Sequence, residues 1–251
     1  MKKWLGLENY DDLNIELIKK LDFDGCIVGD PFCTYRMFKY GDADLLWIIQ
    51  DIVKSGKAII FQTPVYITDR NFRHVSEIIS CLYEKYKVRK FLVQDIGLVE
   101  WITQKYPDCE IIWSHWGRNR NSMINHDFIS FIKQIGICGI ETSIKERISA
   151  ISKAGLPVYA VYGNTTYNTL CRDCYNLYML DCYDGLCQRE CLNNEMYLVD
   201  KKIKMSIDGH LLGRKIQYPK DSDYYSFSTK YSENIMVYAH NCYDIPRVGE
   251  K

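Results

Sequence analysis

Five cysteines lie close together in the second half of this chain and have the chemistry of metal ligands. They are Cys171, Cys174, Cys182, Cys187 and Cys191, out of eleven cysteines in all. Cys187 and Cys191 are four residues apart, so one helical turn or a tight loop directs both sulfurs the same way. Converging thiolates bind iron–sulfur clusters, and four of them also suit a structural zinc ion. The spacing predicts a metal site that includes Cys174, Cys187 and Cys191. It leaves open whether the site holds an iron–sulfur cluster or zinc.

Four other residues are candidates for catalysis because each lies at or just after the end of a strand-like run. They are Asp30, Asp95, His115 and Glu141. Catalytic groups gather at the carboxyl ends of parallel strands, although polar residues there also cap the following helices. His115 lies between Trp113 and Trp116, and aromatic walls suit a planar substrate.

The elements that must position these residues alternate along the first 165 residues. Short apolar runs are typical of buried parallel strands, and the segments between them have the period of amphipathic helices. The strand-like runs are 26–28, 58–61, 90–93, 110–113, 139–141 and 158–161, with further candidates at 4–7 and 235–238. The helical segments are 45–53, 74–86, 98–105, 128–134 and 144–153, and Gly56, Gly136 and Gly155 suit left-handed helix ends.

Eight strands with intervening helices predict a single α/β domain, a (β/α)₈ TIM-type barrel over residues 1–251. The sequence contains no glycine-rich phosphate-binding loop, which would have favoured a doubly wound sheet instead. The alternation of strand-like and helical segments stops in residues 163–232, which are predicted to be a Cys- and Tyr-rich insertion before the last strand. The chain stops soon after that strand, so we expect the final helix to be missing or replaced and the barrel to be incomplete there.

Composition limits the binding partners and the cellular compartment that we expect for this protein. The 32 basic and 32 acidic residues cancel, which leaves no net field to attract nucleic acid or an anionic membrane. The apolar runs are too short to span a bilayer, and the N-terminus lacks the apolar core of a signal peptide. We therefore expect a cytoplasmic protein, in which thiols stay reduced and bind metals more readily than they form disulfides.

Motifs along nearly the whole chain resemble the collagenase-like peptidase family, number thirty-two among peptidases of unknown catalytic type. The stretch CIVGDPFCTYR at residues 26–36 resembles that family's strand, Gly-acidic pair, cysteine and downstream arginine. The stretches KSGKAIIFQT at 54–63, FLVQDIG at 91–97 and YG at 162–163 resemble later parts of its pattern. The likeness is greatest to the UbiV branch, which contains iron–sulfur proteins of oxygen-independent ubiquinone biosynthesis.

The resemblance implies a [4Fe–4S] cluster with one ligand from an early strand end and three from the late cysteine region. Matched by motif, these ligands are Cys33, Cys174, Cys187 and Cys191. Cys171 and Cys242 are rival ligands, and zinc is the alternative metal.

The resemblance also implies a part in oxygen-independent hydroxylation of a small molecule or nucleobase, with a related barrel as partner in a heterodimer. One alternative is a peptidase acting on collagen-like or other peptides, although no Ser-His-Asp spacing and no His-Glu-x-x-His motif supports proteolysis. A second alternative is a non-catalytic, cluster-bearing subunit of a heteromeric complex.

Overall fold

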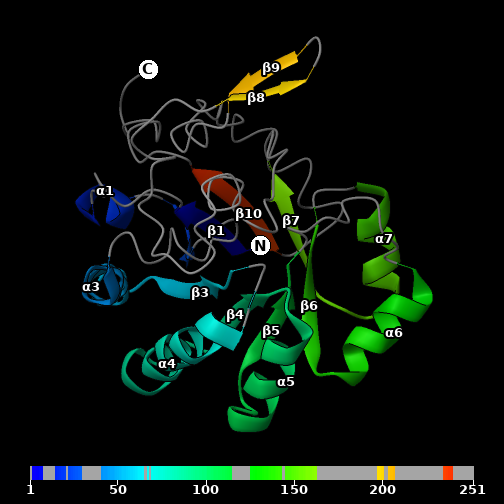
Figure 1. The fold of residues 1–251 in the computed structure, drawn as a ribbon, viewed down its shortest axis with the longest axis horizontal. Helices are drawn as coiled ribbons and strands as arrows, with labels where there is room; N and C mark the ends of the chain where they lie inside the picture. Colours follow the sequence, from blue (N-terminus) through cyan, green and yellow to red (C-terminus); the bar gives the residue numbers. More distant parts are fainter. Residues whose placement is uncertain are drawn as a thin grey trace.

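The computed structural model describes residues 2–7, 15–20, 22–29, 41–64, 67, 69–114, 125–142, 145–162, 197–200, 203–206 and 234–239. Strands and helices alternate through most of this part of the chain (Figure 1). Their bounds are β1 (Lys2–Leu7), α1 (Ile15–Lys20), β2 (Gly25–Val28), α3 (Gly41–Lys54), β3 (Ala58–Gln62), α4 (Asp69–Tyr86), β4 (Lys90–Val93), α5 (Ile96–Lys105), β5 (Glu110–Trp113), α6 (His126–Gln134), β6 (Ile137–Thr142), α7 (Lys145–Lys153), β7 (Val158–Tyr162), β8 (Tyr197–Asp200), β9 (Ile203–Ser206) and β10 (Asn234–Ala239).

Eight of these strands form a closed, all-parallel barrel in the order β1-β10-β7-β6-β5-β4-β3-β2. The predicted (β/α)₈ barrel is therefore confirmed. The sheet closes within this chain because β10 pairs with both β1 and β7, so the ring of strands itself is complete. The segment after Ala239, where we expected the last helix to be missing, lies outside the described residues.

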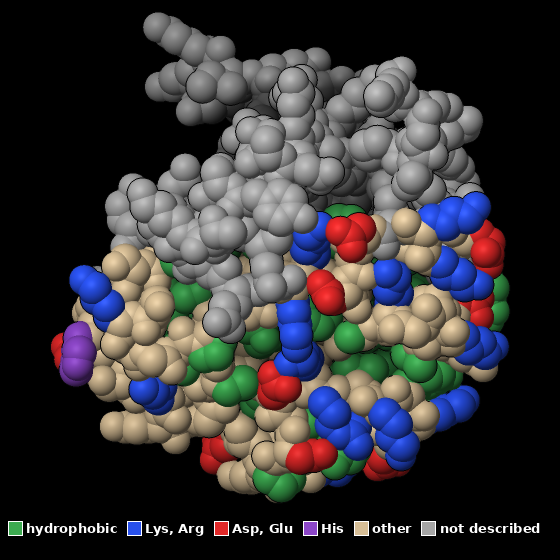
Figure 2. Space-filling model, turned by 180° about the vertical axis from the view of Figure 1, so that it is seen from behind, with side chains coloured by type: hydrophobic (Ala, Val, Ile, Leu, Met, Phe, Trp, Pro, Cys, Tyr) green, Lys and Arg blue, Asp and Glu red, His purple; other side chains and the backbone are tan. Residues whose placement is uncertain are grey.

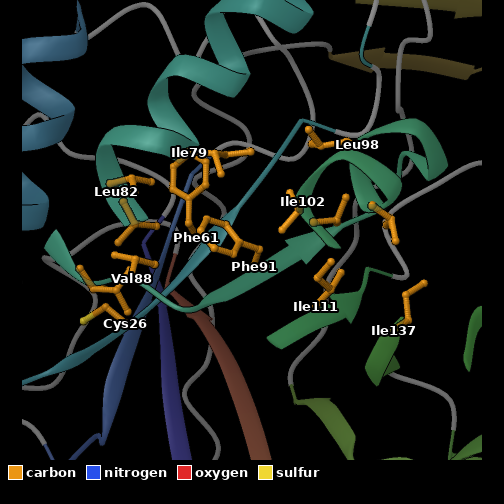
Figure 3. Close-up of a cluster of buried hydrophobic side chains, with 14 of the residues drawn as sticks. Cys26, Phe61, Ile79, Leu82, Val88, Phe91, Leu98, Ile102, Ile111 and Ile137 are labelled. Atoms are coloured by element: carbon orange, nitrogen blue, oxygen red, sulfur yellow. The ribbon is translucent and has the colours of Figure 1, made fainter. Parts of the chain in front are cut away.

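The main core lies between the barrel wall and the helices that surround it. Phe61 of β3 and Phe91 of β4 meet edge to face with their ring centroids 6.4 Å apart. Figure 3 shows these rings beneath Ile79 and Leu82 of α4. Fully burying side chains of this size stabilises the fold by roughly 1.5–3 kcal/mol each. We call this cluster the shell core, and its members on β1 to β7 identify the face of each of these strands that points away from the barrel axis.

The opposite face of each strand fills the inside of the barrel, where large and small residues alternate. The Trp4 ring occupies the space that a Cβ at Gly25 would need, since that Cβ would lie 2.5 Å from a ring carbon. Gly139 leaves room in the same way for the ring of Tyr159. Burial raises the pKa of the Tyr159 hydroxyl, with the Glu110 carboxylate adding to the effect. The barrel is thus a packed core and not a channel.

Strand β6 carries an irregularity that accounts for one of the cysteines outside the predicted metal site. Its register with β5 shifts between Ile111 and Ile112, which pair with Ile137 and Gly139. Cys138 is the extra residue, and its thiol donates a hydrogen bond to the Ile111 carbonyl at 3.2 Å. Burial raises the pKa of this thiol, so Cys138 behaves as a protonated packing residue and not as a thiolate.

Two features of the chain were not predicted from the sequence. One is the short helix α1. The other is the pair of strands β8 and β9, which come between β7 and β10 in the sequence and form a separate antiparallel hairpin away from the barrel strands in Figure 1. The rest of the predicted insertion lies outside the described residues, and a single domain over residues 1–251 stays a prediction. The predicted glycine helix ends are confirmed, with φ of +79° at Gly56, +91° at Gly136 and +76° at Gly155.

The described surface agrees with the balanced composition. Lys and Arg side chains are interspersed with Asp and Glu on the face shown in Figure 2. Within the described ranges, no helix has the length and apolar character needed to cross a bilayer.

Candidate functional site

The carboxyl ends of β3, β4, β5 and β6 each carry polar residues directly after the apolar run. These residues are Gln62 and Thr63, Gln94 and Asp95, Ser114, and Glu141 and Thr142. Gln62, Ser114 and Glu141 are no more than 3% exposed. Buried polar groups cost free energy unless they form hydrogen bonds, so this concentration at one end of the barrel calls for a functional explanation.

Strand alternation decides which of these side chains point into the barrel. Phe61, Val93 and Ile140 belong to the shell core, and Trp113 packs against it. Successive side chains of a strand point to opposite faces. The next residue on each strand therefore points inward, which gives a set that we call the polar row: Gln62, Gln94, Ser114 and Glu141.

Register places three members of the polar row side by side. Val93 pairs with Trp113 and Trp113 pairs with Ile140, so Gln94, Ser114 and Glu141 follow in line on neighbouring strands. The Ser114 hydroxyl donates a hydrogen bond to Glu141 Oε2 at 3.0 Å. Glu141 is entirely buried, and a carboxyl group withdrawn from water in this way needs hydrogen-bond partners. The pair fixes the position of a carboxyl group inside the mouth of the barrel.

Two side-chain amide atoms of the polar row differ from the hydrogen-bonded Ser114–Glu141 pair. Gln62 Nε2 and Gln94 Oε1 are buried and have no hydrogen-bond partner among the described residues. A buried unpaired polar atom costs about 1–3 kcal/mol. Native proteins seldom keep such groups without a use for them.

Asp95, one of the predicted catalytic residues, has a structural role in this geometry. It is the N-cap of α5, and its carboxylate accepts a hydrogen bond from the Leu98 backbone N–H at 2.8 Å. Asp95 follows the inward Gln94 and so points outward, toward the helix. Its catalytic role stays a prediction, whereas the cap accounts for its presence.

A substitution series tests the capping role of Asp95. Asp95→Ala should lower the free energy of unfolding by about 1 kcal/mol through loss of the cap. Asp95→Asn should keep most of that stability because asparagine caps as well as aspartate does. Chemical denaturation measures both changes. Asn125→Ala is the matched control, since Asn125 caps α6 through Phe128 N at 2.8 Å. Equal losses from Asp95→Asn and Asp95→Ala would contradict a simple cap.

The other predicted site residues lie outside the part of the chain that the structure describes. They are Asp30, Cys33, His115, Cys174, Cys187 and Cys191. Within the described part, no group of three or more His, Cys, Asp or Glu side chains is arranged to hold a metal ion. Of the predicted residues, Glu141 alone is both described and directed into the barrel mouth.

The polar row itself was largely missed from the sequence, which pointed to Glu141 but not to Gln62, Gln94 or Ser114. The signal that finds them is positional. In each case the first polar residue after the apolar run points into the barrel. On β3, β4 and β6 the next residue, Thr63, Asp95 or Thr142, follows on the opposite face of the strand. The Thr63 hydroxyl donates a hydrogen bond to the Leu92 carbonyl of β4 at 3.2 Å.

Comparison with known proteins supports the architecture. No protein-family model matches the sequence, and no curated protein matches it. The solved structure of the U32 peptidase Mk0906 is similar, with a TM-score of 0.55 and 15% identity over 95% of this chain and 93% of that one. The orotidine 5'-monophosphate decarboxylase from Metallosphaera sedula gives a TM-score of 0.44 and 13% identity over 66% of this chain and 79% of that one. The strand order makes the chain a (β/α)₈ barrel, and it shares its fold with the U32 peptidase over nearly the full length of both.

Proposed function

We propose that this chain is an iron–sulfur barrel protein of the collagenase-like peptidase family that takes part in oxygen-independent hydroxylation. The observation that carries the proposal is the likeness of fold to the U32 peptidase, which extends over 95% of this chain. Combined with the motif resemblance and the late cysteine cluster, it favours this family over other barrels. In this proposal a [4Fe–4S] cluster is held by Cys33, Cys174, Cys187 and Cys191.

The strand order supports a cluster that joins ligands from distant parts of the sequence. Around the barrel, β2 and β7 are separated only by β1 and β10. Three steps of about 4.8 Å make roughly 14 Å along the wall. Cys33 follows the end of β2 by five residues, and five residues span up to about 17 Å. An early ligand is therefore within reach of ligands that follow β7 at the same end of the barrel.

The chemistry of the thiols also fits this choice of ligands. Cys109 has its pKa raised to about 11, mainly by burial, so it is protonated at neutral pH and does not compete as a ligand. Cys26 is buried in the shell core. Four thiolates from the remaining cysteines make the donor set that a [4Fe–4S] cluster requires. When bound, such a cluster supplies electron transfer or activation of an oxygen-bearing donor at the barrel mouth.

The residues of this chain would then bind and orient the acceptor. The Glu141 carboxylate, fixed by Ser114 at 3.0 Å, is the described group best suited to take or return a proton there. Its burial keeps water away from the reacting position, which strengthens each polar contact.

Iron and sulfide analysis after anaerobic purification tests the cluster. About four irons and four sulfides per chain are expected, with the broad visible absorption of a [4Fe–4S] centre. Cys187→Ser should lose most of the iron. Cys81→Ser is the matched control, because Cys81 is half-buried in α4 and should keep it. Stoichiometric zinc without sulfide, or a Cys187→Ser protein with its iron intact, would overturn the proposed cluster.

The second candidate function is a peptidase, favoured by the name of the similar structure. Incubation of the anaerobic protein with collagen-like peptides, with and without a chelator, distinguishes the two. Cleavage that persists in Cys187→Ser would favour the peptidase. The pairing with a related barrel stays a prediction, which co-purification from a host expressing both chains would test.

A further inference from the structure

The unpaired amides of the polar row indicate what kind of group enters the barrel mouth. Gln62 lies in register with Leu92 on β4, so Gln94 is one strand across and two residues further on. Strand spacing and rise place their Cα atoms roughly 8 Å apart. Two glutamine side chains at that separation can contact one small group from two sides.

The unpaired atoms are a donor, Gln62 Nε2, and an acceptor, Gln94 Oε1. Each glutamine amide carries one donor group and one acceptor group. If both amides rotate by half a turn, Gln62 presents the acceptor and Gln94 the donor, so the pair still lacks one partner of each kind. The complementary ligand therefore carries a carbonyl oxygen and an N–H close together.

The charges around the polar row favour a neutral ligand. Glu141 is fully buried in line with Gln94 and Ser114, so a bound group would lie beside a carboxyl side chain, which offers an anion no charge attraction. Among the described residues of the eight barrel strands, the cations are Lys2, Lys3 and Lys90. All three lie at the amino-terminal ends of β1 and β4, at the far end of the barrel. Nothing described at the mouth would compensate a carboxylate or phosphate.

We propose that the barrel mouth binds a small neutral carboxamide or lactam, whose carbonyl accepts from Gln62 and whose N–H donates to Gln94. The bound group lies next to the Ser114–Glu141 pair, so Gln62 and Gln94 position it for chemistry there. This inference does not depend on the cluster, because it rests on the polar row alone.

Saturation-transfer NMR with 2-pyrrolidone as the probe tests the proposal on the full chain. The lactam should bind with a dissociation constant in the millimolar range, as expected for so few atoms. Cyclopentanone keeps the ring and the carbonyl but lacks the N–H, and butyrate carries a negative charge. Both should bind about tenfold more weakly or worse. Equal signals from the lactam and cyclopentanone, or no lactam signal, would overturn the proposal without any variant being needed.

Substitution of the glutamines gives a second and opposite pair of readouts. Gln62→Met and Gln94→Met keep the side-chain length and remove the unpaired amide atoms. Each should abolish lactam binding and raise the melting temperature of the free protein by about 2–6 °C, because a buried unsatisfied group is removed. Gln134→Met, at the exposed end of α6, is the control and should change neither. A glutamine held by structural bonds would instead lower the melting temperature when replaced. That result, or unchanged lactam binding in both variants, would refute the site. Iron content is measured separately, so failure of the cluster and failure of this site are distinguishable.

Discussion

Gly29→Ala should lower the free energy of unfolding by about 3 kcal/mol or more, a large fraction of the stability of a single domain. Gly29 follows β2 with φ of +131°, a conformation that residues with a side chain rarely adopt. A Cβ at this position would lie 2.0 Å from the Gln62 carbonyl oxygen and 2.9 Å from its carbonyl carbon. These are backbone atoms of β3, which is held by β2 on one side and β4 on the other. Neither strand can yield without disturbing the ring.

Gly56→Ala is the control that separates overlap from backbone strain. Gly56 also has positive φ, at +79°, but a Cβ there would meet no atom within 4 Å. It should cost about 1 kcal/mol, the expense of a left-handed conformation alone. Denaturation midpoints of the two variants measure the difference, and a Gly29→Ala loss no greater than that of Gly56→Ala would contradict the packing argument. Because Gln62 belongs to the polar row, a destabilised Gly29 variant should also bind 2-pyrrolidone less well.

The barrel was predictable because its strands and helices leave different patterns in the sequence: short apolar runs for the strands and amphipathic segments for the helices. Runs such as Ile59 to Phe61 are apolar on both faces, as expected for strands buried between helices and the barrel interior. The last strand followed from its apolar content, although more than 70 residues separate the start of β10 from the end of β7. The predicted run 139–141 covers only part of β6, which extends from Ile137 to Thr142 and includes the extra residue Cys138.

The hairpin β8–β9 escaped prediction for a related reason. Lys204 interrupts the apolar residues of β9, and the apolar run of β8 is short, from Tyr197 to Val199 before Asp200. Antiparallel strands need only one apolar face. Their alternation is a weaker signal than the runs that mark the barrel strands.

The sequence indicated where the polar row lies and one of its members, Glu141, but not the other three. The sequence correctly indicates that polar residues after the strands gather at one end of the barrel. It does not say which of two consecutive polar residues faces inward, because a shift of one residue exchanges the faces of a strand. Asp95 has the more reactive side chain of its pair, yet Gln94 has the inward parity and Asp95 caps α5. Only the shell core, formed by contacts between distant elements, fixes that parity.

Glu141→Gln should reduce turnover by about 10²- to 10⁴-fold, the range for loss of a general acid or base. The amide keeps the size of the side chain and still offers an oxygen to the Ser114 hydroxyl, which lies 3.0 Å from Glu141 Oε2. A neutral amide costs less to bury than a carboxylate, so the free energy of unfolding should change little. The measurement is the rate of whichever reaction the wild-type protein performs, set beside its denaturation midpoint.

Ser114→Ala distinguishes a reacting carboxylate from one that only supports the fold. This change leaves the Glu141 carboxylate in place but removes a buried donor, which should lower the free energy of unfolding by about 1–3 kcal/mol. Turnover should fall less than in Glu141→Gln, because the proton acceptor remains and only its orientation is loosened. The two variants therefore affect stability and rate in opposite order. If Glu141→Gln kept full turnover while losing as much stability as Ser114→Ala, the carboxylate would be part of the packing of the barrel mouth and the chemistry would have to lie with other residues.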